Sequence, residues 1–283
     1  MSGPHLFGPE QLGPDPFDPD LFDPAVNAEY MPSQRVPDAR AYFTAWAERS
    51  AQVRREHPPR LLRYGPGEHE TMDLFGPSGT AAGTLLFIHG GYWLAFYKDD
   101  FSYVAPALLA RGWRVAVMSY DLAPAVALRH IVRQARVAAS VLAQACPGPL
   151  VVAGHSAGGH LTAMIHSTDW AAEGLRAPRL TASIGISGLY DLAPLRRTEL
   201  QPDLRLTEQE AFALSPLHAS PTTHAPFLAA VGDLESASFL AQSRRLAEHW
   251  PRTRLWQQPG RHHFDAPDDL PALLEDVLAG EGG

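Results

Sequence analysis

The sequence has little cysteine, no long apolar run and no signal-peptide pattern. Its single cysteine, Cys146, cannot form a disulfide within the chain, which is typical of proteins from the reducing cytoplasm. The longest apolar stretches, around residues 84–88 and 114–118, have the length of a strand and are far too short to span a membrane. The amino terminus has neither the basic start nor the continuous apolar stretch of a signal peptide. We therefore expect a cytoplasmic protein with no membrane partner.

Blocks of like charge and the common metal and dinucleotide motifs are also absent. The net charge is −8, and acidic and basic residues are mixed along the chain, so no surface for nucleic acid is expected. No H-E-x-x-H, H-x-H-x-D-H or C-x-x-C spacing occurs, and no G-x-G-x-x-G follows a strand at the start of a helix. The sequence thus predicts no metal and no cofactor, and it leaves a small-molecule substrate as the partner. A homodimer is compatible with the sequence, although no motif fixes the oligomeric state.

The first 25 residues form a proline-rich arm that differs from the rest of the chain. Gly-Pro and Asp-Pro pairs recur there, and Phe17-Asp18-Pro19 is repeated as Phe22-Asp23-Pro24. Proline at this density blocks helices and sheet ladders and favours extended or irregular backbone. We predict an arm that is disordered or lies along the surface. Alternatively, Phe7, Phe17 and Phe22 dock the arm on a partner subunit or over the active site.

Residues 26–283 alternate between strand and helix patterns, which predicts a single α/β domain. The expected strands are apolar runs without polar alternation, as in a mostly parallel sheet covered by helices on both faces; they span 60–64, 71–75, 84–89, 114–120, 150–154, 181–187, 227–232 and 254–258. The expected helices span 37–56, 101–111, 127–145, 157–167, 208–214, 236–250 and 267–279, with a capping box at Thr207-x-x-Glu210. We expect the first two strands to pair antiparallel at one edge and residues 190–226 to form a small cap.

The segment Gly154-His155-Ser156-Ala157-Gly158 is the most informative motif in the chain. A serine stands between two glycines, directly after the apolar run 150–153, in the order strand, sharp turn and helix of a nucleophile elbow. The glycines are needed because side chains beside this strained turn would collide with the neighbouring strand and helix. Ser156 is therefore the candidate nucleophile of an α/β-hydrolase fold.

A second motif, His89-Gly90-Gly91-Tyr92-Trp93, follows an earlier strand. Loops of this H-G-G type supply backbone N–H groups to the oxyanion hole of α/β-hydrolases. We expect the oxyanion hole to use the N–H groups of Gly90, Gly91 and Ala157, the last being the residue after the nucleophile. His89 is predicted to anchor the loop rather than to transfer protons.

A serine hydroxyl needs a base to activate it and an acid to orient the base, and in this fold they follow in the order serine, acid, histidine. The acid is expected after the next-to-last strand, where Asp233 and Glu235 compete. The base is expected after the last strand, where His262 and His263 compete. Asp233 is alternatively a turn residue, and Glu235 an ordinary carboxylate at a helix start. The position of these residues after their strands decides neither the acid nor the base.

These motifs resemble the arylformamidase (kynurenine formamidase) branch of the α/β-hydrolases, which is akin to the hormone-sensitive-lipase esterases. The resemblance covers most of residues 26–270 and is carried by segments 29–30, 36–38, 89–93, 98–102, 120–124, 154–161 and 187–195. The H-G-G-Y-W form at 89–93 is the most telling, because lipase-like relatives more often have a third glycine there.

The resemblance implies roles for individual residues. It makes Ser156 the nucleophile and His263 the base, and it selects Glu235 as the acid, because the family's acid precedes a Ser-x-x-Phe stretch, here residues 236–239. The family usually has aspartate at this place, so the glutamate is a departure. It keeps the charge but must orient the imidazole from a different backbone position.

The family reaction implied by the resemblance is the metal-independent hydrolysis of N-formyl-kynurenine to kynurenine and formate. Because a formyl group is small, the aromatic leaving group must supply most of the binding, and we expect Tyr92, Trp93 and Tyr190 to form pocket walls. Arg196 and Arg197 are candidates for holding the substrate carboxylate. The same triad would serve a carboxylesterase acting on small acyl or aryl esters. A non-catalytic binding protein built on a hydrolase fold is the third interpretation.

Overall fold

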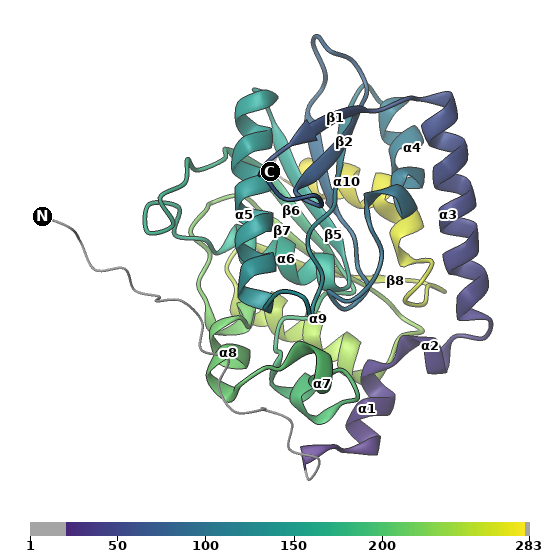
Figure 1. The fold of residues 1–283 in the computed structure, drawn as a ribbon, viewed down its shortest axis with the longest axis vertical. Helices are drawn as coiled ribbons and strands as arrows, with labels where there is room; N and C mark the ends of the chain where they lie inside the picture. Colours follow the sequence, from purple (N-terminus) through teal and green to yellow (C-terminus); the bar gives the residue numbers. More distant parts are fainter. Residues whose placement is uncertain (1–20, 281–283) are drawn as a thin grey trace, which may run out of the picture.

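A computed structural model describes residues 21–280 of the chain and places its strands in one eight-stranded sheet (Figure 1). The strands are β1 (Arg60–Arg63), β2 (Thr71–Phe75), β3 (Thr84–Ile88), β4 (Arg114–Met118), β5 (Leu150–His155), β6 (Leu180–Ile186), β7 (Phe227–Gly232) and β8 (Thr253–Gln258). Their spatial order is β1-β2-β4-β3-β5-β6-β7-β8. β1 and β2 are antiparallel to their neighbours, whereas β3 to β8 are parallel. The predicted strands and the antiparallel edge are confirmed.

Helices cover both faces of this sheet. One face packs against α5 (Leu128–Ala145), α6 (Ala157–His166) and α9 (Ala237–His249), and the other against α3 (Ala39–Glu56), α4 (Ala105–Leu109) and α10 (Leu270–Ala279). Successive strand residues point to opposite faces, so a strand covered on both faces needs apolar side chains throughout. Leu85 and Leu86 of β3 accordingly enter different core clusters, and both are fully buried.

Two of the predicted helices start with a 3₁₀ turn, so that their α-helical part begins later than expected. The segment 101–111 consists of the 3₁₀ turn η3 (Ser102–Val104) and α4, and the segment 267–279 consists of the 3₁₀ turn η6 (Ala266–Asp269) and α10. Pro106 and Pro271 stand in the first turn of their helices. Proline fits there because an N–H in the first turn has no carbonyl within the helix to bind.

A short helical strap, residues 23–36, was not predicted as helix. It contains α1 (Pro24–Tyr30) and α2 (Pro32–Arg35). Asp23 caps α1, since its carboxylate accepts hydrogen bonds from the N–H groups of Ala25 and Val26 at 2.9 and 3.3 Å. Residues 1–20 of the predicted arm, with Phe7 and Phe17, lie outside the described residues.

The predicted cap segment, residues 190–226, contains the 3₁₀ turns η4 (Ala193–Arg197) and η5 (Pro216–His218) and the helices α7 (Gln201–Leu204) and α8 (Glu208–Ala213). The predicted capping box at the start of α8 is confirmed, because Thr207 Oγ1 accepts from the N–H of Glu210 at 3.1 Å. The cap touches the strap, since the N–H of Glu199 donates to Asn27 Oδ1 at 2.9 Å. Strap and cap together are called the covering layer below.

A buried carboxylate ties the loop after β3 to the antiparallel edge of the sheet. Asp73 on β2 is 2% exposed and pairs with Arg54 of α3 and with Lys98, whose Nζ lies 3.3 Å from Asp73 Oδ1. The N–H of Lys98 also donates to Ser119 Oγ at 2.9 Å. A buried charge is costly unless it is paired. These contacts therefore fix the far end of the loop that carries Gly90 and Gly91.

Candidate active site

Ser156 lies at a strained turn between β5 and α6, with φ 56° and ψ −118°. Residues with side chains rarely adopt a positive φ, and such strain is often found at functional sites. The two flanking glycines are required by close packing. A Cβ added to Gly154 would lie 2.1 Å from the carbonyl oxygen of Gly158, and one added to Gly158 would lie 2.0 Å from that of Ile88. The strand, sharp turn and helix predicted around Ser156 are present.

Two of the predicted oxyanion-hole residues, Gly90 and Ala157, lie next to Ser156. A Cβ added to Gly90 would lie 3.0 Å from Ser156 Cβ, and Gly91 has a φ of 103° that favours glycine. Among the loop hydrogen bonds of residues 21–280, none uses the N–H of Gly90 or Gly91. Ala157 is the first residue of α6, where an N–H has no acceptor within the helix. The structure thus describes no acceptor for these three N–H groups, as the predicted oxyanion hole requires.

His89 anchors this loop, as predicted. Its Nδ1 donates to the carbonyl oxygen of Gly90 at 2.8 Å, and its ring stacks on Tyr120 with the centroids 4.2 Å apart. The Tyr120 hydroxyl in turn donates to the carbonyl oxygen of His89 at 3.0 Å. Burial lowers the pKa of His89 to about 4, so the imidazole is neutral at pH 7.

The structure joins Glu235 to His263 and separates them from their sequence competitors. His263 Nδ1 lies 2.7 Å from Glu235 Oε2, and the two residues are only 4% and 8% exposed. A carboxylate can only accept, so Nδ1 is the donor in this contact, and in the neutral imidazole the lone pair is on Nε2. Asp233 is exposed and accepts from the N–H of Gly260 at 2.8 Å. His262 turns away, because its Nε2 lies 2.9 Å from the Tyr42 hydroxyl.

Ser187 is a site residue that the sequence analysis missed. Its hydroxyl donates to Glu235 Oε1 at 2.5 Å, and the N–H of Gly232 donates to the same oxygen at 2.9 Å. Ser187 is fully buried and has a φ of 53°, directly after β6. Since β6 and β7 are parallel neighbours, a polar residue at the end of β6 was the signal that could have placed it beside the acid.

His155 links the nucleophile elbow to the loop of the base. Its Nε2 lies 2.8 Å from the carbonyl oxygen of His263, and the two rings are 4.8 Å apart between centroids. Burial first, and the neighbouring His263 second, hold the pKa of His155 well below its usual value. The described residues show no hydrogen bond between Ser156 Oγ and His263, a contact that in other hydrolases often tightens only with substrate bound.

Of the three expected pocket walls, Trp93 and Tyr190 are corrections, since both are fully buried in core clusters. Tyr92 donates its hydroxyl to the carbonyl oxygen of Tyr30 in the strap, and Trp93 packs edge-on against His160 with the centroids 5.0 Å apart. Tyr190 is fully buried in a core cluster with Phe227. Its ring fills the space that Gly185 of β6 leaves, since a Cβ on that glycine would lie 2.2 Å from the Tyr190 hydroxyl oxygen. Tyr190 is therefore part of the core.

The expected carboxylate ligands of the cap are engaged elsewhere. Arg197 pairs with Asp23 at the start of the strap. Arg196 donates from Nε to the carbonyl oxygen of Leu206 at 3.3 Å.

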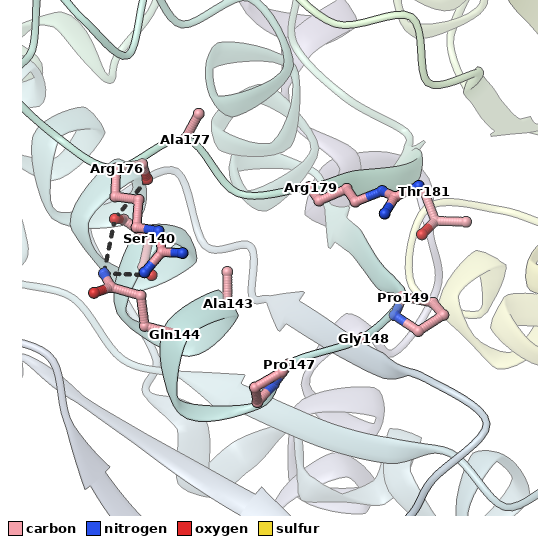
Figure 2. A pocket seen from close by; sticks show the side chains of 10 residues that line it. All are labelled: Ser140, Ala143, Gln144, Pro147, Gly148, Pro149, Arg176, Ala177, Arg179 and Thr181. Carbon is pink, nitrogen blue, oxygen red and sulfur yellow. Dashed lines mark hydrogen bonds between the residues drawn. The ribbon is translucent and has the colours of Figure 1, made fainter.

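A cavity of about 550 Å³ lies away from the candidate catalytic residues (Figure 2). It is formed where α5 ends and where β5 and β6 begin, with Arg176 beside Ser140 and Gln144 and with Arg179 beside Thr181. Ser156 follows the opposite, carboxyl end of β5. The size of a cavity alone thus does not locate the chemistry of this protein.

Two further findings concern metals and membranes. Within residues 21–280, no group of three or more His, Cys, Asp and Glu side chains is arranged to hold a metal ion. No helix in this described part of the chain is long and apolar enough to cross a membrane.

Residues 85–245 match a protein-family model described as the alpha/beta hydrolase fold. A curated relative, the kynurenine formamidase of Salmo salar, is 33% identical over 221 residues, which are 73% of this chain and 75% of the relative. The chain belongs to the α/β-hydrolase family, in its kynurenine formamidase branch. The kynurenine formamidase of Drosophila melanogaster is 29% identical over 79% of this chain and 83% of that protein. This α/β-hydrolase is therefore a formamidase-like enzyme.

Solved structures of other α/β-hydrolases share its architecture. One from Silicibacter sp. TM1040, described as a candidate thioesterase, superposes with a TM-score of 0.83 and 34% identity, and covers 90% of this chain and 97% of that chain. An esterase from Pyrobaculum calidifontis superposes with a TM-score of 0.68 and covers 93% of this chain and 100% of that chain. Its identity is 17%, so this second likeness concerns the fold alone.

Proposed function

We propose that Ser156, His263 and Glu235 form a catalytic triad that hydrolyses N-formyl arylamines of the N-formyl-kynurenine type without a metal ion. The observation that carries the proposal is the buried hydrogen bond of 2.7 Å between Glu235 and His263. His155, the residue before Ser156, is in turn hydrogen-bonded to the carbonyl oxygen of His263. The substrate class is supported by the curated relatives named kynurenine formamidase.

In the proposed reaction, Ser156 Oγ attacks the formyl carbon and His263 Nε2 takes the hydroxyl proton. Glu235 stabilises the imidazolium that forms, through the hydrogen bond to Nδ1. The N–H groups of Gly90, Gly91 and Ala157 bind the developing oxyanion. The C–N bond then breaks, and His263 protonates the leaving arylamine. Water, activated by the same histidine, releases formate and regenerates the serine hydroxyl.

Glutamate in place of the family's aspartate is compatible with this role. Its longer side chain reaches back so that one carboxylate oxygen meets His263 while the other accepts from Ser187 and Gly232. Hydrogen bonds to both oxygens leave the carboxylate little rotational freedom. The imidazole is therefore oriented as firmly as a triad requires.

The closed surroundings of the triad favour a small acyl group. Ser156 is 2% exposed and His263 is 4% exposed beneath the covering layer. A formyl group adds only one carbon and one oxygen at the nucleophile, and exclusion of water strengthens the interactions of the oxyanion hole.

The test compares two substrates at the same enzyme. We expect a higher kcat/KM for N-formyl-kynurenine than for p-nitrophenyl acetate, and no turnover of either by Ser156→Ala. Turnover of the ester alone would make the protein a carboxylesterase with the same triad. If wild-type Ser156 also resists labelling by a fluorophosphonate probe, the protein is not a serine hydrolase and a binding role follows.

A further inference from the structure

Among residues 21–280, the cavity shown in Figure 2 is lined by two arginines and by no aspartate or glutamate. Arg176 and Arg179 both belong to the loop between α6 and β6. The volume of about 550 Å³ is in the range of pockets that bind small molecules, about 300–1,000 Å³. Because the whole chain has a net charge of −8, this concentration of positive charge is a local feature.

The two guanidinium groups have no partner within the described part of the chain. Neither forms an ion pair or a side-chain hydrogen bond there, and both residues are exposed. The acids of the same loop are engaged elsewhere, since Glu173 pairs with Arg136 of α5 and Asp169 accepts from the N–H of Ala171 at 3.1 Å. An anion that binds here would therefore displace no ion pair of the folded protein.

The backbone of this loop is fixed against α5. Ser140 is 3% exposed, and its Oγ donates to the carbonyl oxygen of Arg176 at 2.7 Å. Gln144 Nε2 donates to the carbonyl oxygen of Ser140 at 3.0 Å, and Arg136 Nε donates to Thr168 Oγ1 at 3.0 Å. Only the arginine side chains thus have to be ordered when a ligand binds, which keeps the entropic cost of binding low.

A β-bulge brings one more hydroxyl to the cavity. Leu150 of β5 pairs with Leu180, and the next residue of β5 pairs with Ala182, so Thr181 is an extra residue without a partner on β5. Bulges of this kind redirect a side chain and are frequent beside functional sites. The Thr181 side chain lines the cavity beside Arg179 (Figure 2).

We propose that this cavity binds a phosphorylated small molecule, with its phosphate at Arg176 and Arg179 and its organic part against Pro147 and Pro149. A phosphate monoester carries nearly two negative charges at pH 7, which suits two arginines, and its oxygens match the donor fork of a guanidinium. The Thr181 hydroxyl is a further donor. The two prolines are exposed and offer apolar rings for the organic part of the ligand.

This site is separate from the proposed catalytic residues. It lies where β5 begins, whereas Ser156 follows the end of the same strand. The inference therefore does not depend on the proposed formamidase function, and a test of ligand binding decides it without any measurement of turnover.

The experiment measures binding of AMP, glucose 6-phosphate and inorganic phosphate to the whole protein by isothermal titration calorimetry. We expect at least one of the two organic phosphates to bind more tightly than inorganic phosphate. The double variant Arg176→Gln/Arg179→Gln should weaken that binding by at least about tenfold, as for loss of a hydrogen bond to a charged group. The single variants, each with a smaller loss, serve if the double variant has a lower thermal unfolding midpoint.

Arg40→Gln is the matched control, because Arg40 is an exposed arginine at the start of α3, away from the cavity. It should leave binding unchanged. Failure of both organic phosphates to bind the wild-type protein would overturn the proposal, as would equal binding by wild type and the arginine variants. Binding of inorganic phosphate as tightly as both organic phosphates would overturn the role of the prolines and with it the ligand class.

Discussion

The catalytic loops and the covering layer are held in place by different kinds of contact. Around the proposed triad the contacts are buried and short, such as Ser187 to Glu235 at 2.5 Å and His155 to the His263 carbonyl at 2.8 Å. The strap and cap combine such hydrogen bonds, for example Ser236 Oγ to the Glu29 carbonyl at 2.7 Å, with partly exposed ion pairs such as Arg197 with Asp23. Buried hydrogen bonds fix geometry, whereas exposed ion pairs contribute little.

This difference separates two tasks. Catalysis requires the reacting groups to be fixed within a fraction of an ångström, and the ends of parallel strands in a packed sheet supply that rigidity. Substrate choice depends on surfaces that can differ between relatives without disturbing the triad. We therefore expect changes in the catalytic loops to lower turnover of every substrate, and changes in the covering layer to alter preference among substrates.

The largest effect is expected at the base. His263→Ala should lower kcat by about 10⁵- to 10⁶-fold, as for removal of the histidine in other serine hydrolases. His262→Ala should retain activity within about tenfold, since its ring binds Tyr42 rather than Glu235. Steady-state kinetics on either substrate measures both. Comparable losses of kcat in the two variants would contradict the assignment of the base role to His263 alone.

A somewhat smaller effect is expected at the acid. Glu235→Gln should lower kcat by about 10⁴-fold, because an amide can present its N–H₂ to the imidazole and favour the wrong tautomer. Asp233→Asn should change kcat less than about threefold, since Asp233 is exposed and accepts a hydrogen bond from the N–H of Gly260 rather than facing His263. The reverse order in kcat would assign the acid role to Asp233.

Ser187 tests whether the acid itself needs support. Ser187→Ala removes one hydrogen bond to a charged group, which contributes about 1.5–3 kcal/mol, and should lower kcat by about 10- to 100-fold with KM little changed. Ser187→Thr, which keeps the hydroxyl, should recover part of the activity. A loss confined to KM in Ser187→Ala would contradict a role in positioning Glu235.

Buried histidines predict a dependence of stability on pH. Burial lowers the pKa of His89, His160 and His166 to about 4 from 6.5 in the unfolded chain. Below pH 6.5 the unfolded state binds protons that the folded state does not, so the free energy of unfolding should fall as the pH decreases from 6.5 to about 4. Each group contributes up to about 1.4 kcal/mol per pH unit in this window.

His166 is the residue to test this, because it packs on Trp250 and Phe227, away from the triad. In His166→Gln the slope of unfolding free energy against pH, from urea titrations, should be shallower by one proton between pH 6.5 and 4. An unchanged slope would show that His166 does not stay neutral in the folded protein.

The smallest effect is expected in the covering layer. Arg197→Gln breaks the pair with Asp23 and should lower the free energy of unfolding by about 1 kcal/mol or less, as for other exposed ion pairs. Turnover of p-nitrophenyl acetate should stay within about twofold of wild type. A loss of several kcal/mol in a thermal or urea titration would show that the strap stabilises the whole domain.

Much of this architecture could be predicted from the sequence because its signals are local. The central strands β3, β4, β5 and β7 are apolar at nearly every position, and the candidate catalytic residues stand close behind strand ends. The choice of Glu235 over Asp233 came only from the family resemblance, and His263 over His262 likewise, since both choices depend on side-chain direction.

The rest depends on contacts between distant segments. The helices of the strap have seven and four residues, too short to show helical periodicity. Tyr190 was expected to form a pocket wall, but its ring packs into the core over Gly185 of β6, where a side chain would leave no room for it. Ser187 meets Glu235 only once β6 and β7 are paired.

The division between the two regions is tested most directly by one ratio, the kcat/KM for N-formyl-kynurenine divided by that for p-nitrophenyl acetate. It is measured in wild type and in Glu235→Gln. We expect Glu235→Gln to lower both constants by a similar factor and to leave the ratio within about threefold of wild type. A larger change of the ratio in Glu235→Gln would contradict the separation of catalysis from substrate choice.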